Sequence, residues 1–353
     1  MASIPPPTTT LASLIDKAHE ERAAADHERF REHLGASLLG HPCARWLWLS
    51  FRWTVAPGFP GRILRVFRRG LNEEAQIVSD LRAAGVDIRE TGDHQRRMVL
   101  GPHLGGSVDG VIHSGVPEAP RKKHIAEFKT HSSKSFDKLE REGVKKAHPM
   151  HWTQMQCYMH GTHSTEGDKI DRALYVAVCK DNDRLYTERV EYDKQAAEKA
   201  IQRGLDIVAA DRPPLRISDD PSWWQCKMCQ AHDLCHGSKL TREVNCRTCA
   251  HSTPLDDGQW RCERHDANGI PAEYQRTGCE SHALHPDLVP WEMADPVDRW
   301  TPVFIVNGKK VANGEADAHI FSSREIVANP AACDPESEEL RGLREEMGGR
   351  VVG

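Results

Sequence analysis

An acidic and a basic side chain stand two residues apart in the segment HIAEFKT, residues 124–130, whose other residues suit a β-strand. Because side chains alternate between faces along a strand, Glu127 and Lys129 share one face and Phe128 points to the other. An isolated Glu-x-Lys pair is most often a solvated surface ion pair. A catalytic interpretation requires further acidic residues that the fold brings to the same place.

Asp109 is such a residue, since it lies in GGSVDGVI, 18 residues before Glu127. Neighbouring strands would bring Asp109, Glu127 and Lys129 to one end of a sheet, and Glu74 can approach from an upstream helix. Carboxylates suit Mg²⁺ or Mn²⁺, and the Phe128 carbonyl is a further candidate ligand. A lysine there can orient or deprotonate water and stabilise charge on a phosphate. The set therefore predicts metal-assisted phosphodiester hydrolysis.

The elements that must position these residues follow from hydrophobic periodicity and turn signals. After a flexible Pro/Thr-rich lead over 1–10 we expect helices at 11–34 and 70–85. Three strands at 96–100, 107–113 and 124–130, a helix at 148–161 and a buried strand at 172–179 complete an α/β core. A strand at 184–192, a helix at 193–210 and a hairpin around 307–308 are expected beyond it.

Four pieces of sequence in this order resemble the PD-(D/E)XK nucleases of the RecB and lambda-exonuclease type. The pieces are Glu74 in RRGLNEE, Asp109 in GGSVDG, EFK at 127–129, and Gln154-x-x-x-Tyr158 in QMQCY. The resemblance implies a restriction-endonuclease-like core with the order helix, three strands, helix, strand. Each piece alone is weak evidence for the family, because such short patterns occur by chance in many proteins. All four pieces in this order, on suitable elements, are strong evidence.

The resemblance also implies roles for these residues. Mg²⁺ or Mn²⁺ would be bound by Glu74, Asp109, Glu127 and the Phe128 carbonyl, and the catalytic residues would be Glu74, Asp109, Glu127 and Lys129. Gln154 and Tyr158 would contact DNA near the scissile phosphate; the alternative for them is the polar face of a packed helix. Glu73 is the alternative to Glu74.

Two sets of cysteines suggest further metal sites. The first set consists of Cys226, Cys229 and Cys235, with Cys43 far upstream. Four thiolates make a complete tetrahedral set, and this one resembles the CRISPR-associated and AddB-type nucleases, in which a four-iron four-sulfur cluster ties the N-terminal segment to the end of the core. The alternatives are zinc bound by the three clustered cysteines with His236 or His232, and buried thiols without a metal.

The second set has the spacing C-x2-C-x12-C-x16-C and consists of Cys246, Cys249, Cys262 and Cys279. This spacing is typical of a small structural zinc site, in which the metal supplies folding energy that a short polar segment lacks. A second iron–sulfur cluster is the alternative, and His251 or His265 can replace one cysteine as a ligand.

Composition sets the class of protein and its organisation. The 353 residues are 39% hydrophobic, which predicts a soluble globular chain with a real core. Eleven cysteines without an apolar leader favour metal ligation in the cytoplasm, and no segment is apolar enough to enter a membrane. We expect an N-terminal lead and helix over 1–36, a nuclease core over 37–237, a cysteine-rich metal-binding module over 238–295, and a hairpin with an acidic tail over 296–353.

Charge is distributed unevenly along the chain, although its net value is only -5. Residues 43–69 contain six arginines and no acid, interleaved with tryptophan and phenylalanine. Such a segment suits phosphate contacts and base stacking, or it is a solvated face. No phosphate-binding Gly-x-x-x-x-Gly-Lys loop occurs.

Together these features predict a metal-dependent DNA exonuclease. The chain, including VCKDNDRLYTERVEY after the core helix, resembles phage and prophage recombination exonucleases that resect DNA ends for an annealing protein. The resemblance implies double-stranded ends or single strands as substrate and a single-strand annealing protein as partner, and oligomer formation is compatible with it. The competing hypothesis is a nuclease-like protein that binds nucleic acid or a partner without cutting and uses its cysteines for structural zinc.

Overall fold

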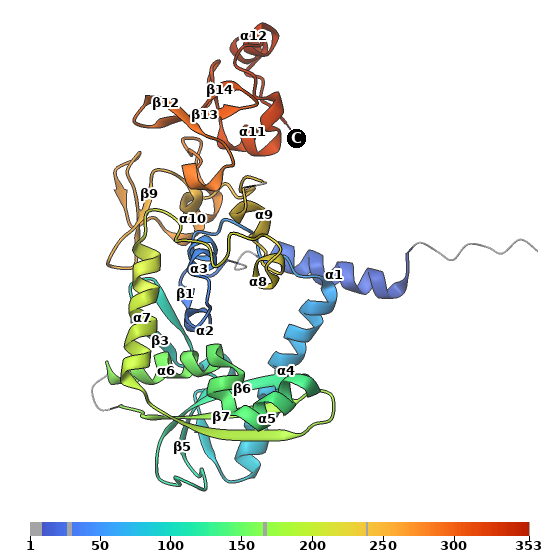
Figure 1. Cartoon of the computed structure of the whole chain (residues 1–353), viewed down its shortest axis with the longest axis vertical. Coiled ribbons are helices and arrows are strands. Elements are labelled where there is room, and N and C mark those ends of the chain that lie inside the picture. The colour runs from blue at the N-terminus through green and yellow to red at the C-terminus, as the bar shows by residue number, and fades with distance from the viewer. Residues whose placement is uncertain (1–8, 27–29, 165–167, 238, 353) are drawn as a thin grey trace, which may run out of the picture. The chain divides into compact units, whose positions relative to one another are not determined.

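The structure is a computed structural model that describes residues 9–26, 30–164, 168–237 and 239–352 (Figure 1). Most of the expected N-terminal lead, residues 1–8, lies outside this range. The chain divides into two compact units. The first comprises Met1–His41 and Pro57–Gly204, and the second comprises Pro42–Ala56 and Leu205–Gly353.

The centre of the first unit is a five-stranded sheet in the order β2-β5-β6-β7-β8. Its strands are β2 (Asp87–Arg89), β5 (Gly110–Ser114), β6 (His124–His131), β7 (Arg172–Cys179) and β8 (Leu185–Glu191). β6 and β7 are parallel, and the other neighbours are antiparallel. The register sets Glu127 opposite Tyr175, so these two side chains lie on the same face of the sheet.

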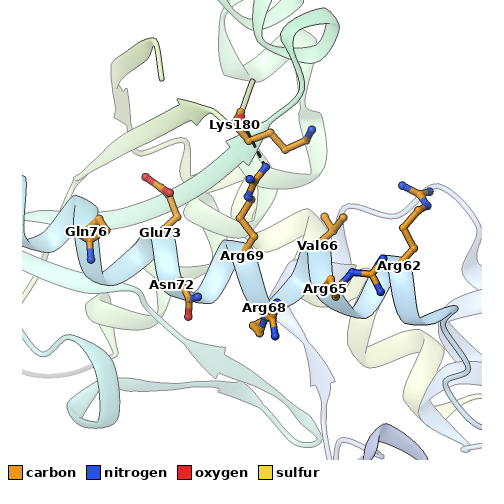
Figure 2. A pocket seen from close by; sticks show the side chains of 9 residues that line it. All are labelled: Arg62, Arg65, Val66, Arg68, Arg69, Asn72, Glu73, Gln76 and Lys180. Carbon is orange, nitrogen blue, oxygen red and sulfur yellow. Dashed lines mark hydrogen bonds between the residues drawn. The ribbon is translucent and has the colours of Figure 1, made fainter. Parts of the chain in front are cut away.

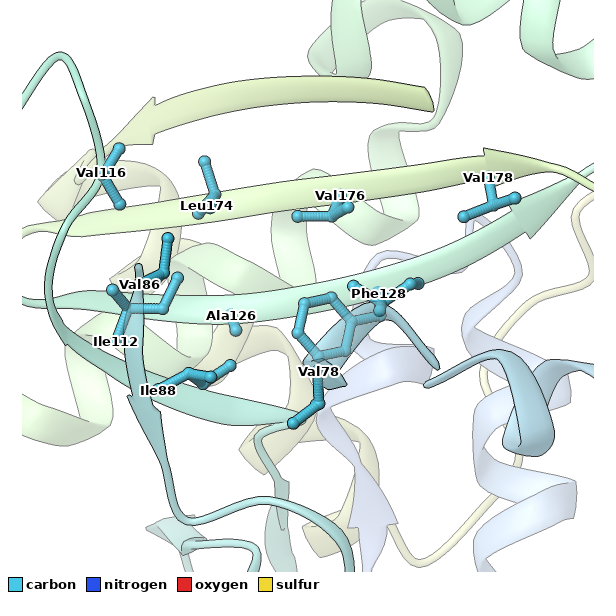
Figure 3. Packing of buried hydrophobic residues seen from close by; sticks show 11 residues of the cluster. Val78, Val86, Ile88, Ile112, Val116, Ala126, Phe128, Leu174, Val176 and Val178 are labelled. Carbon is cyan, nitrogen blue, oxygen red and sulfur yellow. The ribbon is translucent and has the colours of Figure 1, made fainter. Parts of the chain in front are cut away.

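One face of this sheet packs against helix α4 (Gly61–Ala83) through an apolar core. Figure 3 shows Phe128 of β6 in this cluster with Val176 and Val178 of β7 and Val78 of α4. The alternation expected for residues 124–130 is therefore present. Ala126 and Phe128 face α4, whereas Glu127 and Lys129 form an ion pair on the opposite face.

The opposite face is covered by α5 (Ser133–Ala147) and α6 (Pro149–His163). A second, three-stranded sheet has the order β1-β4-β3, from β1 (Leu34–Gly35), β4 (Leu104–Ser107) and β3 (Arg97–Gly101). The remaining elements of this unit are α1 (Leu11–Ala25), α2 (Ala36–Leu39) and the 3₁₀ turn η1 (Gly92–His94). The chain passes into the second unit within α7 (Lys194–Ala209).

The mixed α/β fold class is as predicted, but several boundaries are corrected. The helix expected over 11–34 ends at Ala25, and Leu34 belongs to β1. The helix expected over 70–85 begins earlier, at Gly61 after the fixed backbone of Pro60. The strand expected over 107–113 is two strands, β4 and β5, because the chain leaves the ladder at residues 108–109.

The second unit contains short elements around the cysteines and a small C-terminal sheet. The elements up to residue 288 are α3 (Ala44–Phe51), α8 (Trp224–Lys227), α9 (His232–Cys235), η2 (Cys246–Thr248), β9 (Ser252–Pro254), β10 (Trp260–Cys262), β11 (Ala267–Asn268), α10 (Ala272–Thr277) and η3 (Pro286–Leu288). After them come β12 (Met293–Asp298), β13 (Thr301–Val306), β14 (Lys309–Asn313), β15 (Ile320–Phe321), α11 (Ser323–Ala328), η4 (Pro330–Ala332) and α12 (Glu338–Met347). The expected hairpin at 307–308 joins β13 to β14.

A buried arginine explains why residues 42–56 belong to this unit. The Arg247 guanidinium lies 3.7 Å from the centre of the Trp53 ring and 4.9 Å from that of Trp260. It donates hydrogen bonds to the Phe51 carbonyl at 3.0 Å and to Gln275 at 2.9 Å. Aromatic faces and hydrogen bonds together satisfy this buried charge. No helix in the described part of the chain is both long and apolar enough to cross a membrane.

Candidate active site

The predicted catalytic strand, β6, carries a buried glutamate with one unsatisfied oxygen. The Glu127 side chain is 0% exposed, and its Oε1 pairs with the Lys129 ammonium. Its Oε2 has no hydrogen-bond partner among the described residues. Burial raises the pKa of Glu127 to about 8, with a further contribution from the negative charge of Asp109. A buried carboxylate oxygen without a partner is costly, and a bound cation would satisfy it.

Asp109 is held against the same strand from the break between β4 and β5. Its Oδ2 accepts a hydrogen bond from the Phe128 backbone N–H at 2.7 Å. On the other side of that residue, the Lys129 ammonium donates to the Phe128 carbonyl at 3.0 Å. One residue of β6 therefore contacts both Asp109 and Lys129 through its backbone while its ring is in the core.

Glu74 reaches this group from α4. Burial and the charge of Asp109 raise the pKa of Glu74, and Gln95 donates a hydrogen bond to its Oε1 at 2.5 Å. Burial also raises the pKa of Asp109. Glu73, the alternative considered from sequence, lines a different surface of α4, among arginines. The structure thus brings Glu74, and not Glu73, into electrostatic contact with Asp109.

Lys129 remains charged in this surrounding. Burial alone would lower its pKa, but the carboxylates of Glu127 and Asp109 outweigh burial and raise it. Its side chain is 27% exposed, whereas that of Glu127 is fully buried, so a substrate can reach Lys129 more easily than Glu127. Three carboxylates and one ammonium leave an excess of negative charge, which is the electrostatic condition for binding a divalent cation.

The oxygen atoms gathered at this site are of the kind that bind a hard divalent metal ion. Glu74, Asp109 and Glu127 supply carboxylates and Phe128 a carbonyl, the oxygen ligands that Mg²⁺ and Mn²⁺ prefer. In the described residues, no group of three or more His, Cys, Asp or Glu side chains is already arranged around a common metal position. Lys129 contacts the Glu127 carboxylate and the Phe128 carbonyl instead, so these contacts would have to change for a metal to bind there.

The predicted DNA-contacting pair lies on α6 over the same face of the sheet. Gln154 donates to the Tyr158 hydroxyl at 3.4 Å, and both side chains are largely buried. Burial and the charge of Glu127 raise the pKa of Tyr158, so its hydroxyl stays protonated near the carboxylates. A Cβ added to Gly106 would lie 2.6 Å from that hydroxyl, which shows how closely β4 approaches Tyr158.

A histidine cluster beside this site was not predicted. The Tyr175 hydroxyl bonds to His131 Nε2 at 2.8 Å and to His151 Nδ1 at 2.9 Å. His148 stacks on both imidazoles, with ring centroids 4.3 Å from His131 and 5.1 Å from His151, and the three rings form a triangle because His131 and His151 are 5.8 Å apart. Burial lowers the pKa of His131 to about 4. The sequence feature that could have indicated this cluster is the three-residue spacing of His151 and Gln154, which puts both side chains on one side of a helix.

A scan of protein families decides the relationship that the motifs suggested. The family described as the PD-(D/E)XK nuclease superfamily matches residues 9–236. The chain belongs to this superfamily. The match includes the four motif pieces and the first cysteine set, and it ends before the second cysteine set begins.

Three solved structures are similar to parts of this nuclease. One is described as SSO0001, with 15% identity over 64% of this chain and 96% of that chain and a TM-score of 0.39. The second is the alkaline exonuclease LHK-Exo from Laribacter hongkongensis, with 15% sequence identity, coverage of 52% of this chain and 88% of that chain, and a TM-score of 0.35. The third is LHK-Exo in complex with dAMP, with 16% sequence identity, coverage of 52% of this chain and 91% of that chain, and a TM-score of 0.37. No curated protein sequence matches.

The first cysteine set of the nuclease is gathered in the second unit. Burial raises the pKa of Cys226, and the neighbouring thiols of Cys235 and Cys43 raise it further. The same neighbours act on Cys229. Cys43 is therefore close to Cys226 and Cys229, which are distant from it in sequence, although the described thiols lack metal-ligand geometry.

The two histidines considered as zinc ligands differ in their availability. Both nitrogens of His232 are engaged, Nδ1 with Asp233 at 2.9 Å and Nε2 with the Pro221 carbonyl at 3.1 Å. His236 Nε2 is buried without a hydrogen-bond partner among the described residues. His236 is thus the histidine that can serve as a ligand in this region.

The second cysteine set is also gathered. Burial, followed by the thiols of Cys279 and Cys262, raises the pKa of Cys246 to about 12, and burial raises that of Cys249 to about 12. His265 Nε2 lies 3.6 Å from Cys279 Sγ. Sulfur and imidazole donors of this kind suit zinc, which binds thiolates after their protons leave.

Proposed function

We propose that the protein is a Mg²⁺- or Mn²⁺-dependent DNA exonuclease of the PD-(D/E)XK type. The observation that carries the proposal is the arrangement around Phe128. Asp109 is bonded to its N–H, Lys129 to its carbonyl, and Glu127 keeps one buried oxygen without a partner. A solvated surface ion pair would not have its glutamate fully buried beside a second carboxylate.

Each residue has a role in this proposal. Glu74, Asp109, Glu127 and the Phe128 carbonyl hold the metal, which when bound polarises the phosphate and lowers the pKa of a water molecule. Lys129 holds its proton, and its ammonium orients the attacking water and stabilises charge that develops on the phosphate. Gln154 and Tyr158 position the nucleotide next to the scissile bond as hydrogen-bond donors.

The proposal also includes the metals bound by the cysteines, the location of the protein and its biological role. We assign a four-iron four-sulfur cluster to Cys43, Cys226, Cys229 and Cys235, supported by the gathering of these thiols, and zinc to Cys246, Cys249, Cys262 and Cys279. No disulfide joins the eleven cysteines in the described part of the chain, which suits the cytoplasm that we propose as the location. By the resemblance to lambda-exonuclease-type motifs, the activity is end resection in phage-type recombination, with a single-strand annealing protein as partner.

End-labelled DNA tests the activity. Wild-type protein with Mg²⁺ or Mn²⁺ is expected to shorten linear DNA from an end, to spare a covalently closed circle, and to stop in EDTA. Lys129→Met should lose the activity, and Lys122→Met, an exposed lysine before the same strand, should retain it. Linear DNA that stays intact with wild type but is bound equally by wild type and Lys129→Met would favour the competing hypothesis of a binding protein.

Metal analysis tests the cysteine assignments separately. Protein purified without air is expected to be brown and to contain iron, sulfide and zinc. Cys226→Ser should remove iron but not zinc, while Cys333→Ser, a buried thiol outside both sets, should remove neither. A colourless protein that contains only zinc would refute the cluster.

A further inference from the structure

A line of hydrogen bonds runs from the sheet face that carries Glu127 to α5. His151 Nδ1 lies 2.9 Å from the Tyr175 hydroxyl oxygen, which lies 2.8 Å from His131 Nε2. His131 Nδ1 in turn lies 3.0 Å from Ser135 Oγ. We name these four residues, His151, Tyr175, His131 and Ser135, the Tyr175 network.

Every member of the Tyr175 network can both donate and accept a hydrogen bond. A neutral imidazole carries its hydrogen on one ring nitrogen and accepts at the other, and a hydroxyl does both. The Tyr175 hydroxyl has one hydrogen for two imidazole nitrogens, so it donates to one of them and accepts from the other. With neutral rings the hydrogens therefore all point the same way, toward Ser135 or toward His151. Shifting each of them by one bond moves a proton from one end of the network to the other.

The surroundings keep the two imidazoles of the network neutral. Burial, with further contributions from Lys129 and His148, lowers the pKa of His131 to about 4 and that of His151 to about 2. A proton that enters the network at one ring is therefore not retained there and has to be passed on.

The His151 end of the network lies on the side of the candidate active site. Tyr175 stands opposite Glu127 in the ladder between β6 and β7. After burial, the charge of Lys129 is the strongest influence on the pKa of His151. Gln154, a proposed nucleotide contact, follows His151 by three residues on the same side of α6. His151 Nε2 has no hydrogen-bond partner within the described residues, so it can accept a proton from a water molecule beside Lys129.

The Ser135 end of the network lies at the surface of α5. Ser135 lines a cavity of about 620 Å³ together with other polar residues of this helix. Its Oγ also lies 3.4 Å from His148 Nε2. Tyr175 and His131, in contrast, are only 0% and 6% exposed. The network thus joins the candidate active site to solvent on α5 through a buried middle part.

Contacts from the turn after β7 hold the middle of the network in place. The Lys180 N–H in this turn donates to the His131 carbonyl at 2.9 Å. Figure 2 shows Arg69 of α4 pointing to the same turn, where it donates to the Lys180 carbonyl at 3.5 Å. Asp181 accepts a hydrogen bond from the N–H of Ser133, the first residue of α5, at 2.8 Å. These contacts fix the connection between β6 and α5, and proton transfer requires such fixed, short distances.

The proposed hydrolysis needs an acceptor for the proton that the attacking water loses. Lys129 keeps its own proton, and the carboxylates are assigned to the metal, so these groups do not serve. We infer that the Tyr175 network carries this proton to solvent, with His151 as the catalytic acceptor and Tyr175, His131 and Ser135 as positioning residues. The inference rests on the proposed nuclease function, because it adds a proton path to that reaction.

The step balances without a net charge on the network. The water oxygen bonds to phosphorus as one of its O–H bonds breaks, and that proton goes to His151 Nε2. The hydrogen on His151 Nδ1 passes to Tyr175, that of Tyr175 to His131 Nε2, that of His131 Nδ1 to Ser135, and that of Ser135 to solvent. The bond from phosphorus to the leaving oxygen breaks, and this oxygen takes a proton from solvent. After product release the reverse shift, from solvent at Ser135 to water at His151, restores the network.

Single-turnover cleavage of end-labelled DNA with Mg²⁺ tests the inference at the solvent end. Ser135→Ala should slow cleavage about tenfold or more, because a positioned proton acceptor contributes about 10²- to 10⁴-fold. Ser135→Thr restores the hydroxyl and should recover the rate. Ser132→Ala is the matched control, since Ser132 lines the same cavity outside the network, and it should cleave like wild type. Melting temperature and DNA binding in EDTA should be equal for all these proteins.

Two further measurements separate proton transfer from a structural role. Added imidazole, a diffusible proton acceptor, should raise the rate of Ser135→Ala and leave that of Ser132→Ala unchanged. Tyr175→Phe breaks the same path in its middle, so the double variant with Ser135→Ala should be no slower than the slower single variant.

Several results would overturn the inference. Cleavage by Ser135→Ala at the wild-type rate would do so, as would an equal loss of rate in Ser135→Thr. A slow Ser135→Ala variant that imidazole does not accelerate, with a lowered melting temperature, would assign the network a purely structural role. Failure of the proposed function would look different, because wild type itself would then leave linear DNA intact with Mg²⁺ or Mn²⁺, and the network would have no reaction to serve.

Discussion

Replacing Glu127 by glutamine is expected to abolish nuclease activity and also to change how the stability of the metal-free protein depends on pH. Burial raises the pKa of Glu127 from 4.5 to about 8. The same carboxyl in the unfolded chain ionises near 4.5, so between these values only the folded state keeps the proton. The stability contributed by this group is therefore complete below pH 4.5 and is lost as the pH rises toward about 8.

The size of the effect follows from the pKa difference. Each pH unit within this window removes about 1.4 kcal/mol of the free energy of unfolding, so about 2.7 kcal/mol is lost between about pH 5.5 and 7.5. This is an upper value, since the partly exposed Lys129 relaxes with solvent. Glutamine keeps the shape of the side chain, can accept a hydrogen bond from Lys129 and does not titrate.

Hydrogen exchange of the β6 and β7 amides in EDTA, corrected for the intrinsic rate at each pH, measures the free energy of local opening. We expect wild type to lose about 1–3 kcal/mol relative to Glu127→Gln between about pH 5.5 and 7.5, and Mg²⁺ to restore it in wild type only. Glu198→Gln, an exposed glutamate on α7, is the control and should follow wild type. The reasoning would be refuted if the free energy of local opening changed equally with pH in wild type and Glu127→Gln. It would also be refuted if wild type became more stable than Glu127→Gln as the pH rises.

Three further predictions concern single side chains. Lys129→Met should lower the cleavage rate about 10²- to 10⁴-fold while oligonucleotide binding in EDTA stays within about twofold, as gel shift and single-turnover assays would show. Gly106→Ala should place its Cβ 2.6 Å from the Tyr158 hydroxyl and so lower both the melting temperature and the activity. Adding Tyr158→Phe removes that hydroxyl and should recover the melting temperature. A melting temperature that does not recover in the double variant would contradict the clash. Cys246→Ser should release one zinc per chain by metal analysis and make residues 246–279 sensitive to protease, and unchanged zinc would exclude this thiol as a ligand.

The local parts of the core could be predicted because each depends on neighbours in sequence. The alternation of side chains in residues 124–130 predicted the two faces of β6, and the apolar run over 172–179 predicted strand β7. The proline at the start of α6 marked that helix, since proline is tolerated in a first turn. The same-face position of Glu127 and Lys129 needed no more than the period of a strand.

The remaining features depend on contacts between distant residues. β1 pairs with β4 some seventy positions later, as Leu34 opposite Leu104 shows, and no local period encodes that pairing. Arg247 joins residues 42–56 to the cysteine-rich segment through aromatic rings that sequence alone does not place together. Gln95 and Tyr175 take part in the site through hydrogen bonds to Glu74, His131 and His151, so only the folded chain reveals them.

Phe128 shows how the fold determines the chemistry. Its side chain is buried with Val176 and Val178, which fixes the position of the β6 backbone at this point. Its N–H then holds Asp109, and its carbonyl receives Lys129. Because the proposed catalytic groups Asp109 and Lys129 are bonded to a backbone that the core immobilises, their separation depends on packing more than on their own side-chain torsions. Burial and, after it, the negative charge of Asp109 raise the pKa values of Glu74 and Glu127, and both causes are properties of the folded core. A divalent cation is the partner that we propose to relieve this charge.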